Sequence, residues 1–407
     1  MDLSFSPAEE AFRSELRTWL VANLPHQIPE PPTLADEVAW LVEWQRQLAH
    51  GRWVGVHWPT AYGGRGASVV ENYIFQEEMA RSQAPEIINR IGVNLVGPTL
   101  IHHGTAAQKE RYLAKLLTAE ELWCQLFSEP DAGSDLTALR CKAARDGDVF
   151  VVNGQKVWTS YAQFARWGIL LARTDPGAPK AKGISFFIVD MHSAGITIRP
   201  LRQMTGSEEF NEVFLENVRV PAENLVGELN RGWEIAQTTL AHERGTSARQ
   251  LVVHRILLDE LIALARRHRL HGAAAAADPL MRQRLAQVFV EVELLKLHNW
   301  RTLTQLLRSG KPGPESSLVK LFWSEMSQRL HDAAMEILGV HGTLMQGDAR
   351  AVAHGRWPRS YLYYRAGTIF AGTSEIQRNI IAERVLGMPR AEKTDNRQQT
   401  DRQQTRR

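Results

Sequence analysis

The chain has 407 residues, of which 44% are hydrophobic and 23% are charged, and its formal net charge is +3. Because this length exceeds one ordinary hydrophobic core, we expect two or three packed regions. No apolar run approaches the roughly 20 residues of a membrane-spanning helix, so we expect no membrane span. Two cysteines are too few for a disulfide framework or a zinc site, and the N-terminus lacks the pattern of a signal peptide, which favours a cytoplasmic protein.

The positive charge comes from the C-terminal end of the chain. Residues 388–407 hold six Lys or Arg and three Asp or Glu, which accounts for the whole net charge. Residues 391–407 are polar and contain no aromatic residue, so we expect a disordered tail there. Because no basic and aromatic pattern accompanies this tail in the rest of the chain, we expect no nucleic-acid partner.

The first region, residues 1–121, has apolar residues at helical spacing. SPAEEAFRSELRTWLVANL begins with Ser-Pro and has acidic residues in its first turns, which is typical of a helix start. The segments VAWLVEWQRQLAHGRW and NYIFQEEMARS continue the pattern, and the Pro/Gly segment WPTAYGGRG separates them. We therefore predict an N-terminal α-helical domain.

The second region, residues 122–231, is rich in short runs of β-branched and aromatic residues. Runs such as VFVVNGQKVW and GISFFIVD are separated by turn segments such as DAGSD and DPGAPKAKG. This alternation of strand and turn chemistry predicts an antiparallel β-domain.

The third region, residues 232–390, returns to helical spacing in stretches long enough to pack as a bundle. The whole order predicts an α+β fold with an N-terminal helical domain, a central antiparallel β-domain and a C-terminal four-helix bundle. No strand-to-helix GxGxxG element is present, which argues against a dinucleotide-binding Rossmann unit.

Four motifs occur in chain order on this layout. They are LFSEPDAGSDL at 126–136, NGQKVWTSYAQF at 153–164, FNEVFLENVRVP at 210–221 and GTSEIQRNIIAERVLG at 372–387. Together they resemble the acyl-CoA dehydrogenase superfamily of flavoproteins. The resemblance implies FAD between the β-domain and the bundle, an acyl-CoA substrate, an electron-transfer flavoprotein as acceptor, and a homo-oligomer, either dimer or tetramer, or else a hetero-oligomer.

The resemblance also implies flavin contacts from the first motif. Leu126, Phe127 and Ser128 would line the flavin ring through backbone and hydroxyl groups. Ser134, in the AGSD turn, would reach the pyrophosphate or the CoA moiety. A flavin needs an apolar slot with a few donors that stabilise negative charge on its reduced ring, and this segment supplies both.

In the second motif, Trp158 would cover one side of the isoalloxazine, and Thr159 and Ser160 would hydrogen-bond near it. The alternative for Trp158 is an ordinary aromatic residue of the sheet core. The chain has 12 tryptophans, so this alternative is the better interpretation of Trp158 taken without its flanking motifs.

Near the C-terminal end, the resemblance implies cofactor contacts from Thr373 and Glu375. The ILGVHG stretch resembles the family segment that crosses the subunit interface to a neighbour's FAD, which implicates Glu336, Gly339 and Val340. That segment usually begins with Gln and carries two adjacent glycines, so this chain departs from it at two of the three positions.

Many family members also have an Arg-x-x-Phe-Gly sequence that holds the partner's FAD phosphate. This chain has HGAAAAADPLMRQR in its place. Arg282 or Arg284 is a candidate replacement, and the alternative is that both belong to a solvated helix end.

The family reaction needs a carboxylate base with a raised pKa, because the α-proton of an acyl-CoA is only weakly acidic. The usual base is the Glu of Tyr-Glu-Gly-Thr, and this chain reads Phe370-Ala371-Gly372-Thr373. The backbone N–H of Ala371 is still expected to bind the thioester oxygen, with Gly372 beside the substrate. Ser374 and Gln377 stand at the spacing of a helix-opening capping box.

Members that resemble isovaleryl- and long-chain acyl-CoA dehydrogenases carry the base as a Glu followed by Arg on an earlier helix. Here Glu243 precedes Arg244, which would lie near the thioester and the pantetheine arm. Position 243 also lies on the apolar stripe of its helix, and burial there would raise its pKa. That stripe comprises Trp233, Ala236, Leu240, Ser247 and Leu251. The alternative is a partly exposed Glu243 paired with Arg244 or Arg249.

Four other candidates for the base fit less well. Glu375 belongs to the helix start that contacts the cofactor. His242 points about 100° away from the stripe. Glu209 and Glu212 belong to a strand-rich segment that resembles a structural element.

The sequence therefore predicts FAD-dependent α,β-dehydrogenation of an acyl-CoA to the trans-2-enoyl-CoA in fatty acid or lipid catabolism, with Glu243 as base. Two alternatives remain on the same fold. One is an acyl-CoA oxidase, a flavin monooxygenase or a nitroalkane oxidase. The other is a non-catalytic subunit of a heteromeric acyl-CoA dehydrogenase.

Overall fold

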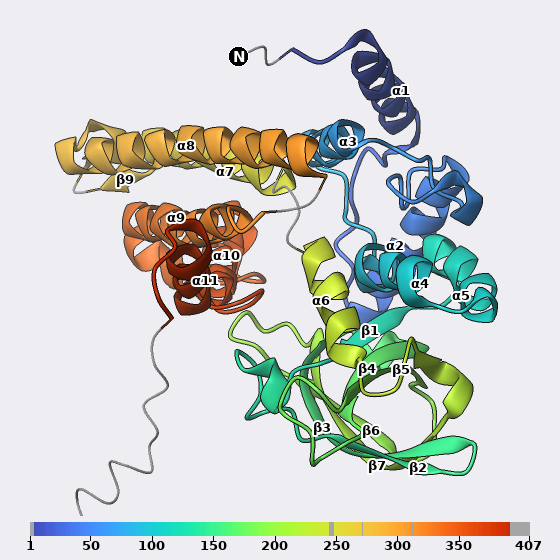
Figure 1. The fold of residues 1–407 in the computed structure, drawn as a ribbon. Helices are drawn as coiled ribbons and strands as arrows, with labels where there is room; N and C mark the ends of the chain where they lie inside the picture. The colour runs from blue at the N-terminus through green and yellow to red at the C-terminus, as the bar shows by residue number, and fades with distance from the viewer. Residues whose placement is uncertain (1–3, 244–247, 271, 311–312, 391–407) are drawn as a thin grey trace, which may run out of the picture.

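The computed structural model describes residues 4–243, 248–270, 272–310 and 313–390, without the side chains of residues 241–243. Helices come first along the chain, an eight-stranded sheet follows, and longer helices complete it (Figure 1). The predicted α+β fold is confirmed. The tail predicted to be disordered lies outside the described residues.

The N-terminal region is built from five helices around a tryptophan-rich core. The helices are α1 (Pro7–Asn23), α2 (Leu34–His50), α3 (Val69–Arg81), α4 (Gly97–His103) and α5 (Ala106–Thr118). Helices α1, α3 and α5 each begin with a capping box, in which a Ser or Thr and a Glu or Gln satisfy each other's backbone N–H groups. Trp44, Trp53 and Trp58 are buried in the core that these helices share.

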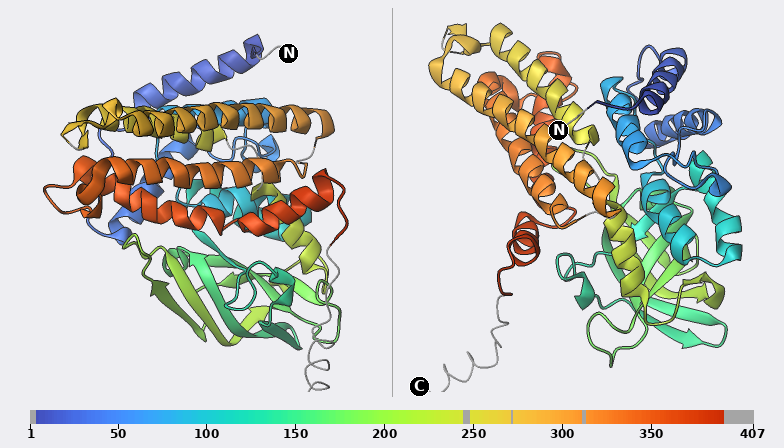
Figure 2. Two further views of the ribbon diagram at one scale, coloured as in Figure 1. Left: turned by 90° about the vertical axis from the view of Figure 1, so that its left-hand side faces the viewer. Right: turned by 45° about the horizontal axis from the view of Figure 1, so that its top comes forward.

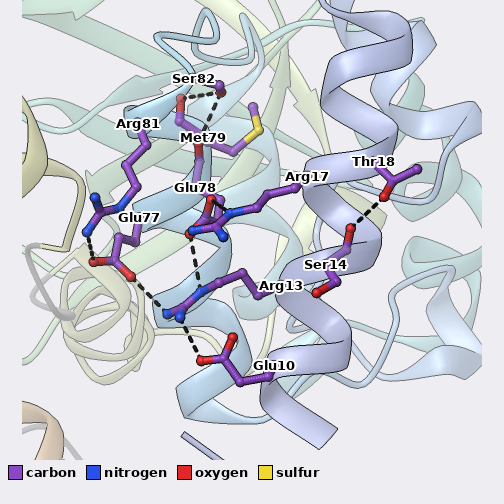
Figure 3. Close-up of polar contacts among 10 residues, drawn as sticks. All are labelled: Glu10, Arg13, Ser14, Arg17, Thr18, Glu77, Glu78, Met79, Arg81 and Ser82. Atoms are coloured by element: carbon purple, nitrogen blue, oxygen red, sulfur yellow. Dashed lines mark hydrogen bonds and ion pairs between the residues drawn. The ribbon is translucent and has the colours of Figure 1, made fainter. Parts of the chain in front are cut away.

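Helix α1 is held on α3 by a network of ion pairs (Figure 3). Nη2 of Arg13 lies 3.1 Å from Oε2 of Glu77, and Nε of Arg17 lies 2.6 Å from Oε2 of Glu78. Glu78 is buried, so its carboxylate depends on these partners to offset the loss of water. The network therefore fixes how α1 crosses α3.

The central region is a sheet with mostly antiparallel pairings. Its strands are β1 (Trp123–Leu126), β2 (Lys142–Asp146), β3 (Val149–Ser160), β4 (Trp167–Arg173), β5 (Ile184–Asp190), β6 (Ile196–Leu201), β7 (Phe210–Pro221) and β8 (Leu225–Val226). Their order is β6-β7-β3-β2-β4-β5-β8. Strand β1 pairs with β4 in parallel, because the β2–β3 hairpin lies between them in the chain and lets β4 return in the same direction.

The C-terminal region begins with a helix that packs on the sheet. Helix α6 (Gly232–Glu243) lies against β5 and α4, and the hydroxyls of Thr99 and Thr239 are 2.9 Å apart at that contact. The remaining helices are α7 (Ala248–Arg267), α8 (Pro279–Ser309), α9 (Ser316–Leu338), α10 (Arg356–Arg365) and α11 (Ser374–Ile380), with two short strands, β9 (Arg269–Leu270) and β10 (Ala273–Ala274). Figure 2 shows α8 and α9 side by side.

The bundle has its own core and touches both other regions. Leu258, Val292 and Leu330, from α7, α8 and α9, are buried together in it. Helix α10 reaches the β6–β7 connection, where Nη2 of Arg359 donates to Oγ of Ser207 at 3.1 Å.

None of the helices within the described residues is long and apolar enough to cross a membrane. The described part of the chain also holds no cluster of His, Cys, Asp or Glu side chains that could bind a metal ion.

Candidate active site

The segment after β1 runs beside β3. The backbone N–H of Val157 donates to the carbonyl oxygen of Ser128 at 2.9 Å. Leu126 and Phe127 are buried, and Ser128 is half-buried. Hence the Leu126–Ser128 segment and the residues around Trp158, which the resemblance joins at a flavin, are neighbours in the fold.

Trp158 points away from the sheet core. Its φ is 60°, a left-handed conformation, and the β3–β7 register shifts between Lys156 and Thr159. This irregularity turns the indole outward, where 61% of the residue is exposed and its ring meets the edge of Phe210 at 6.2 Å between centroids. The ring is therefore not a sheet-core aromatic and is available to cover a ligand.

Thr159 and Ser160 follow Trp158 but differ in burial. Thr159 is fully buried, and its carbonyl oxygen accepts a hydrogen bond from Nδ2 of Asn211 at 3.0 Å. Successive residues of a strand point to opposite faces, so Ser160 shares the face of Trp158 and Thr159 does not. A flavin contact from Thr159 would come from its backbone, and one from Ser160 can come from its hydroxyl.

The turn that contains Ala371 is held open in an unusual conformation. Ala371 has a φ of 52°, which costs an L-residue about 1–2 kcal/mol relative to a right-handed conformation. Nε2 of Gln377 donates to the carbonyl oxygen of Ala371 at 2.9 Å, and Nζ of Lys320 donates to that of Gly372 at 2.7 Å. Within the described residues the Ala371 N–H has no acceptor, so it can donate to a substrate oxygen.

The capping box predicted from Ser374 and Gln377 is wrong. Thr373 is the N-cap of α11, and its Oγ1 accepts from the N–H of Ile376 at 3.2 Å. The side chain of Gln377 turns back instead to the carbonyl oxygens of Ala371 and Gly372. Its role is to fix the turn.

A hollow of about 520 Å³ lies on the other side of this turn, between α9 and α11. Its lining is Glu325, Gln328, Arg329, Asp332, Thr368, Ile369, Thr373, Ser374, Glu375 and Arg378. Ser374 is buried, and its Oγ has no hydrogen-bond partner among the described residues. Three carboxylates line the same hollow, those of Glu325, Asp332 and Glu375, and its two arginines are already paired, Arg329 with Glu291 and Arg378 with Glu325, so its charge does not favour a phosphate group. Thr373 and Glu375, which the resemblance gives as cofactor contacts, both line this space.

A hydrogen bond from the backbone of Glu375 itself, and then one from Thr373, hold the pKa of the Glu375 carboxyl below its usual range, and the charge of Arg378 adds to the effect. Glu375 is therefore an anion at neutral pH. A carboxylate with a lowered pKa is a weak base, so this residue is poorly suited to remove an α-proton.

The residues predicted to reach a neighbouring subunit lie at the far end of α9. Glu336, Gly339 and Val340 are exposed, and Nη1 of Arg284 lies 2.8 Å from Oε2 of Glu336. None of the three is among the residues that line the hollow, whose last lining residue on α9 is Asp332. These residues therefore do not join the hollow of their own chain.

Three further candidates are placed by the fold. Ser134 is exposed between β1 and β2, and Arg282 is exposed near the start of α8. Glu212 accepts from Nε2 of Gln155 at 3.1 Å, which supports its structural interpretation. Glu243 is the last residue of α6, and the structure does not describe its side chain or that of His242. Arg244 lies outside the described residues.

A buried ion pair beneath the Leu126–Ser128 segment was not predicted from the sequence. Lys156 is fully buried, and its Nζ lies 2.8 Å from Oε1 of Glu129 and 3.1 Å from the carbonyl oxygen of Phe127. Glu129 also accepts from the N–H groups of Arg140 and Cys141. The sequence does hold a sign of this ion pair. Lys156 stands at a position of β3 where the alternation of the strand predicts a buried residue, and a buried lysine needs a partner.

The chain matches three family models in order along its length. They are the N-terminal domain of acyl-CoA dehydrogenase at residues 6–120, the middle domain at 124–218 and the C-terminal domain at 230–386. The fold and these matches define a flavin-dependent oxidoreductase. The chain belongs to the acyl-CoA dehydrogenase family, whose members depend on FAD, and FAD is its cofactor.

Similar proteins cover nearly the whole chain. Acyl-CoA dehydrogenase IpdE1 of Mycobacterium tuberculosis is 40% identical over 392 residues, which is 94% of this chain and 99% of that protein. The ChsE4-ChsE5 complex of Mycobacterium tuberculosis contains a chain that is 33% identical, with a TM-score of 0.82 over 96% of this chain and 100% of that chain. The Tcur3481-Tcur3483 steroid acyl-CoA dehydrogenase matches at 32% identity and the same TM-score, over 96% of this chain and 100% of that chain.

Proposed function

We propose that the chain removes the α-proton of an acyl-CoA thioester with Glu243 and forms the trans-2-enoyl-CoA. The observation that carries this proposal is Ala371. The turn has no carboxylate at that position, yet Gln377 and Lys320 hold it in a conformation that presents a backbone N–H. The turn keeps its hydrogen-bond donor, the backbone N–H of Ala371, but has no carboxylate to act as base. This arrangement fits an enzyme whose catalytic base lies on another helix or strand.

The residues of this chain divide the chemistry as follows. The Ala371 N–H donates to the thioester carbonyl oxygen and acidifies the α-carbon. Glu243 accepts the α-proton, and Trp158 shields the reacting face from water. FAD, when bound, would supply the acceptor for the β-hydride at its N5. Leu126, Phe127 and Ser160 would support its ring, and Thr373 and Glu375 would contact it from the start of α11.

We propose further that the acyl group is bulky and ring-bearing. Two observations support this. One similar structure is a steroid acyl-CoA dehydrogenase by its printed title. In addition, Ala371 occupies less space at the turn than the Glu that many family members carry there, which leaves room beside the α-carbon.

For the assembly, we propose a heteromer with a second acyl-CoA dehydrogenase subunit. Both similar structures are titled as pairs of different chains. The outward face of α8 carries exposed apolar side chains that suit a subunit contact: Leu280, Phe289, Val290, Leu294 and Leu297. The predicted homo-oligomer is the alternative. A non-catalytic role within the heteromer is a second alternative, because Ala371 stands in place of the usual base, the ILGVHG stretch departs from the family segment, and the Arg-x-x-Phe-Gly sequence is missing. The electron-transfer flavoprotein as acceptor and the cytoplasmic location remain predictions.

The experiment uses the purified, FAD-loaded protein with whatever subunit co-purifies. Under anaerobic conditions, acyl-CoA should bleach the flavin and yield the trans-2-enoyl-CoA. The Glu243→Gln variant should keep its FAD content and lose bleaching by about 10³-fold or more, since removal of a general base costs about that much. Normal bleaching in Glu243→Gln would refute the base assignment. Stoichiometric consumption of O₂ would instead support the oxidase alternative. If acyl-CoA bleaches only the flavin of the co-purifying subunit, the non-catalytic alternative is supported.

A further inference from the structure

Helix α9 lies beside α11 and holds the Ala371 turn through two of its side chains (Figure 1). Nζ of Lys320 donates to the carbonyl oxygen of Gly372 at 2.7 Å. One turn along α9, the ring of Trp323 lies against that of Phe370, with the two centroids 6.2 Å apart. Of these two contacts, only that of Lys320 brings a formal charge to the turn.

The contact from Lys320 therefore differs in kind from the contact that Gln377 makes with the same turn. Gln377 is a neutral amide, and its Nε2 donates to the carbonyl oxygen of Ala371. Lys320 carries an ammonium group, and its acceptor at Gly372 is a neutral carbonyl. A hydrogen bond of this kind is charge-assisted, and it fixes the position of a positive charge at the turn.

This charge is close to the place proposed for the thioester oxygen. Nζ of Lys320 lies 2.7 Å from the Gly372 oxygen, and standard backbone dimensions place the nitrogen of Ala371 at most about 8 Å from that oxygen. The ammonium group is therefore at most about 11 Å from the N–H that is proposed to hold the thioester oxygen. Two charges interact over such a distance wherever protein replaces part of the water between them.

The neighbouring groups leave much of this effect in place. Lys320 is half-buried, and Trp323 beside it is buried, so protein atoms surround part of the charge. Among the carboxylates of the hollow, Glu325 is paired with Arg378. Glu375 is exposed, and the charge of Lys320 lowers the pKa of its carboxyl less than the hydrogen bonds to that carboxyl do. Glu375 therefore offsets the charge of Lys320 only in part.

We propose that the positive charge of Lys320 favours the enolate that forms when the α-proton leaves, which makes Lys320 a positioning residue of the reaction. This inference rests on the proposed function, in which the Ala371 N–H binds the thioester oxygen. When the α-C–H bond breaks, the proton passes to the carboxylate base and the electron pair of the bond moves toward the thioester oxygen. A cation fixed behind the hydrogen-bond donor stabilises the charge that develops there. At an effective dielectric constant of about 20, a unit charge about 11 Å away shifts such an ionisation by about tenfold.

The test uses the FAD-loaded protein and 3-cyclohexyl-3-oxopropanoyl-CoA as a probe. The α-carbon of this thioester ionises to an enolate that is followed by its absorbance, and its β-carbon bears no hydrogen to transfer. At low ionic strength, where the Debye length exceeds the distance involved, the pH at which the bound probe ionises is compared between variants. Lys320→Gln keeps an N–H donor and loses the charge, so the apparent pKa of the bound probe should rise by about one unit. Its kcat with 3-cyclohexylpropanoyl-CoA should fall about tenfold, with little change in KM.

Three further variants separate charge from structure. Lys320→Arg keeps the charge and should stay within about twofold of the wild type in both measurements. Lys320→Met has a similar length without charge or donor; it should show the same rise in pKa and replaces Lys320→Gln if that variant does not fold. The matched control is Lys296→Gln on α8, where the ammonium lies over the ring of Trp300 at 4.6 Å. It should change neither measurement.

An unchanged pKa of the bound probe in Lys320→Gln would overturn the inference. Equal losses in Lys320→Arg and Lys320→Gln would overturn it as well, because they would show that the exact geometry of the lysine matters and its charge does not. In both cases the wild type still bleaches with acyl-CoA, so the proposed function stands. If no acyl-CoA bleaches the flavin of the wild type, the proposed function itself fails, and the two failures are thus distinguishable.

Discussion

Gln377 and Ala371 are joined by a hydrogen bond of 2.9 Å from Nε2 of the glutamine to the carbonyl oxygen of the alanine. The glutamine is buried, and it reaches back six residues to hold a turn whose central alanine has a positive φ. The start of helix α11, which the sequence predicts, therefore also fixes the conformation of the turn before it through Gln377.

Gln377→Leu should loosen this turn. The substitution leaves the carbonyl oxygen of Ala371 without its side-chain donor, which costs about 1–3 kcal/mol, while that of Gly372 keeps Lys320. We expect kcat with acyl-CoA to fall about tenfold, because the Ala371 N–H is no longer held in place, and FAD content to stay unchanged. Asn379→Ala, at an exposed position of the same helix, is the control and should behave as wild type. Unchanged kcat in Gln377→Leu would show that the turn is fixed by Lys320 alone.

Ala371→Glu should restore activity to the inactive Glu243→Gln variant if both positions reach the same α-proton. In the family the turn is the usual place of the base, and its backbone is already formed here. We expect partial recovery of anaerobic flavin bleaching, about tenfold above Glu243→Gln alone. Ala371→Gln in the same background is the control, since it has the same shape without the carboxylate. No difference between the two double variants would count against a shared proton.

Lys156→Met should destabilise the fold strongly. It leaves the buried carboxylate of Glu129 without its cation, and breaking a buried pair in this way costs about 3–5 kcal/mol. Urea unfolding measures the loss. If the Leu126–Ser128 segment lines the flavin as proposed, the flavin absorption spectrum of the folded fraction should also shift, because Nζ of Lys156 donates to the carbonyl oxygen of Phe127. Lys180→Met, which breaks an exposed pair with Asp135, should change neither.

His254 and His331 should make the bundle sensitive to acid. Burial lowers the pKa of each to about 4, although a hydrogen bond that each ring donates to a backbone carbonyl oxygen opposes the shift. The unfolded chain binds these protons near pH 6.5 and the folded chain does not, so the free energy of unfolding rises with pH between about 4 and 6.5. As the pH falls from about 6.5 to 4, each histidine lowers the free energy of unfolding by up to about 3 kcal/mol.

His331→Phe tests this dependence, because the ring stacks on Tyr364 and a phenyl ring can replace it. The slope of unfolding free energy against pH should fall by about one proton between pH 4 and 6.5. His192→Phe, at an exposed position after β5, is the control. An unchanged slope in His331→Phe would mean that its imidazole charges without unfolding.

Much of the fold follows from the sequence alone. The change from helical to strand periodicity and back gives the α, β, α order, because amphipathic spacing reflects which face of each element is buried. Local chemistry also places helix starts, as at Ser6 and Glu9, where the interacting groups are three residues apart. The turn at Ala371 can also be identified from the sequence, because Phe370-Ala371-Gly372-Thr373 differs from Tyr-Glu-Gly-Thr at two positions, one of them the position of the usual base.

Other features were decided only by tertiary structure. Trp158 faces outward and Thr159 inward because the β3–β7 register shifts between Lys156 and Thr159, and sequence periodicity does not show a shift in pairing. Gln377 braces a turn rather than capping its own helix, since a competing carbonyl lies within reach. Arg249, which the sequence offers as a partner for Glu243, places its Nε on Glu86 instead. Contacts of this kind join residues that are distant in the chain, and only the packing of whole helices and strands brings them within hydrogen-bonding distance.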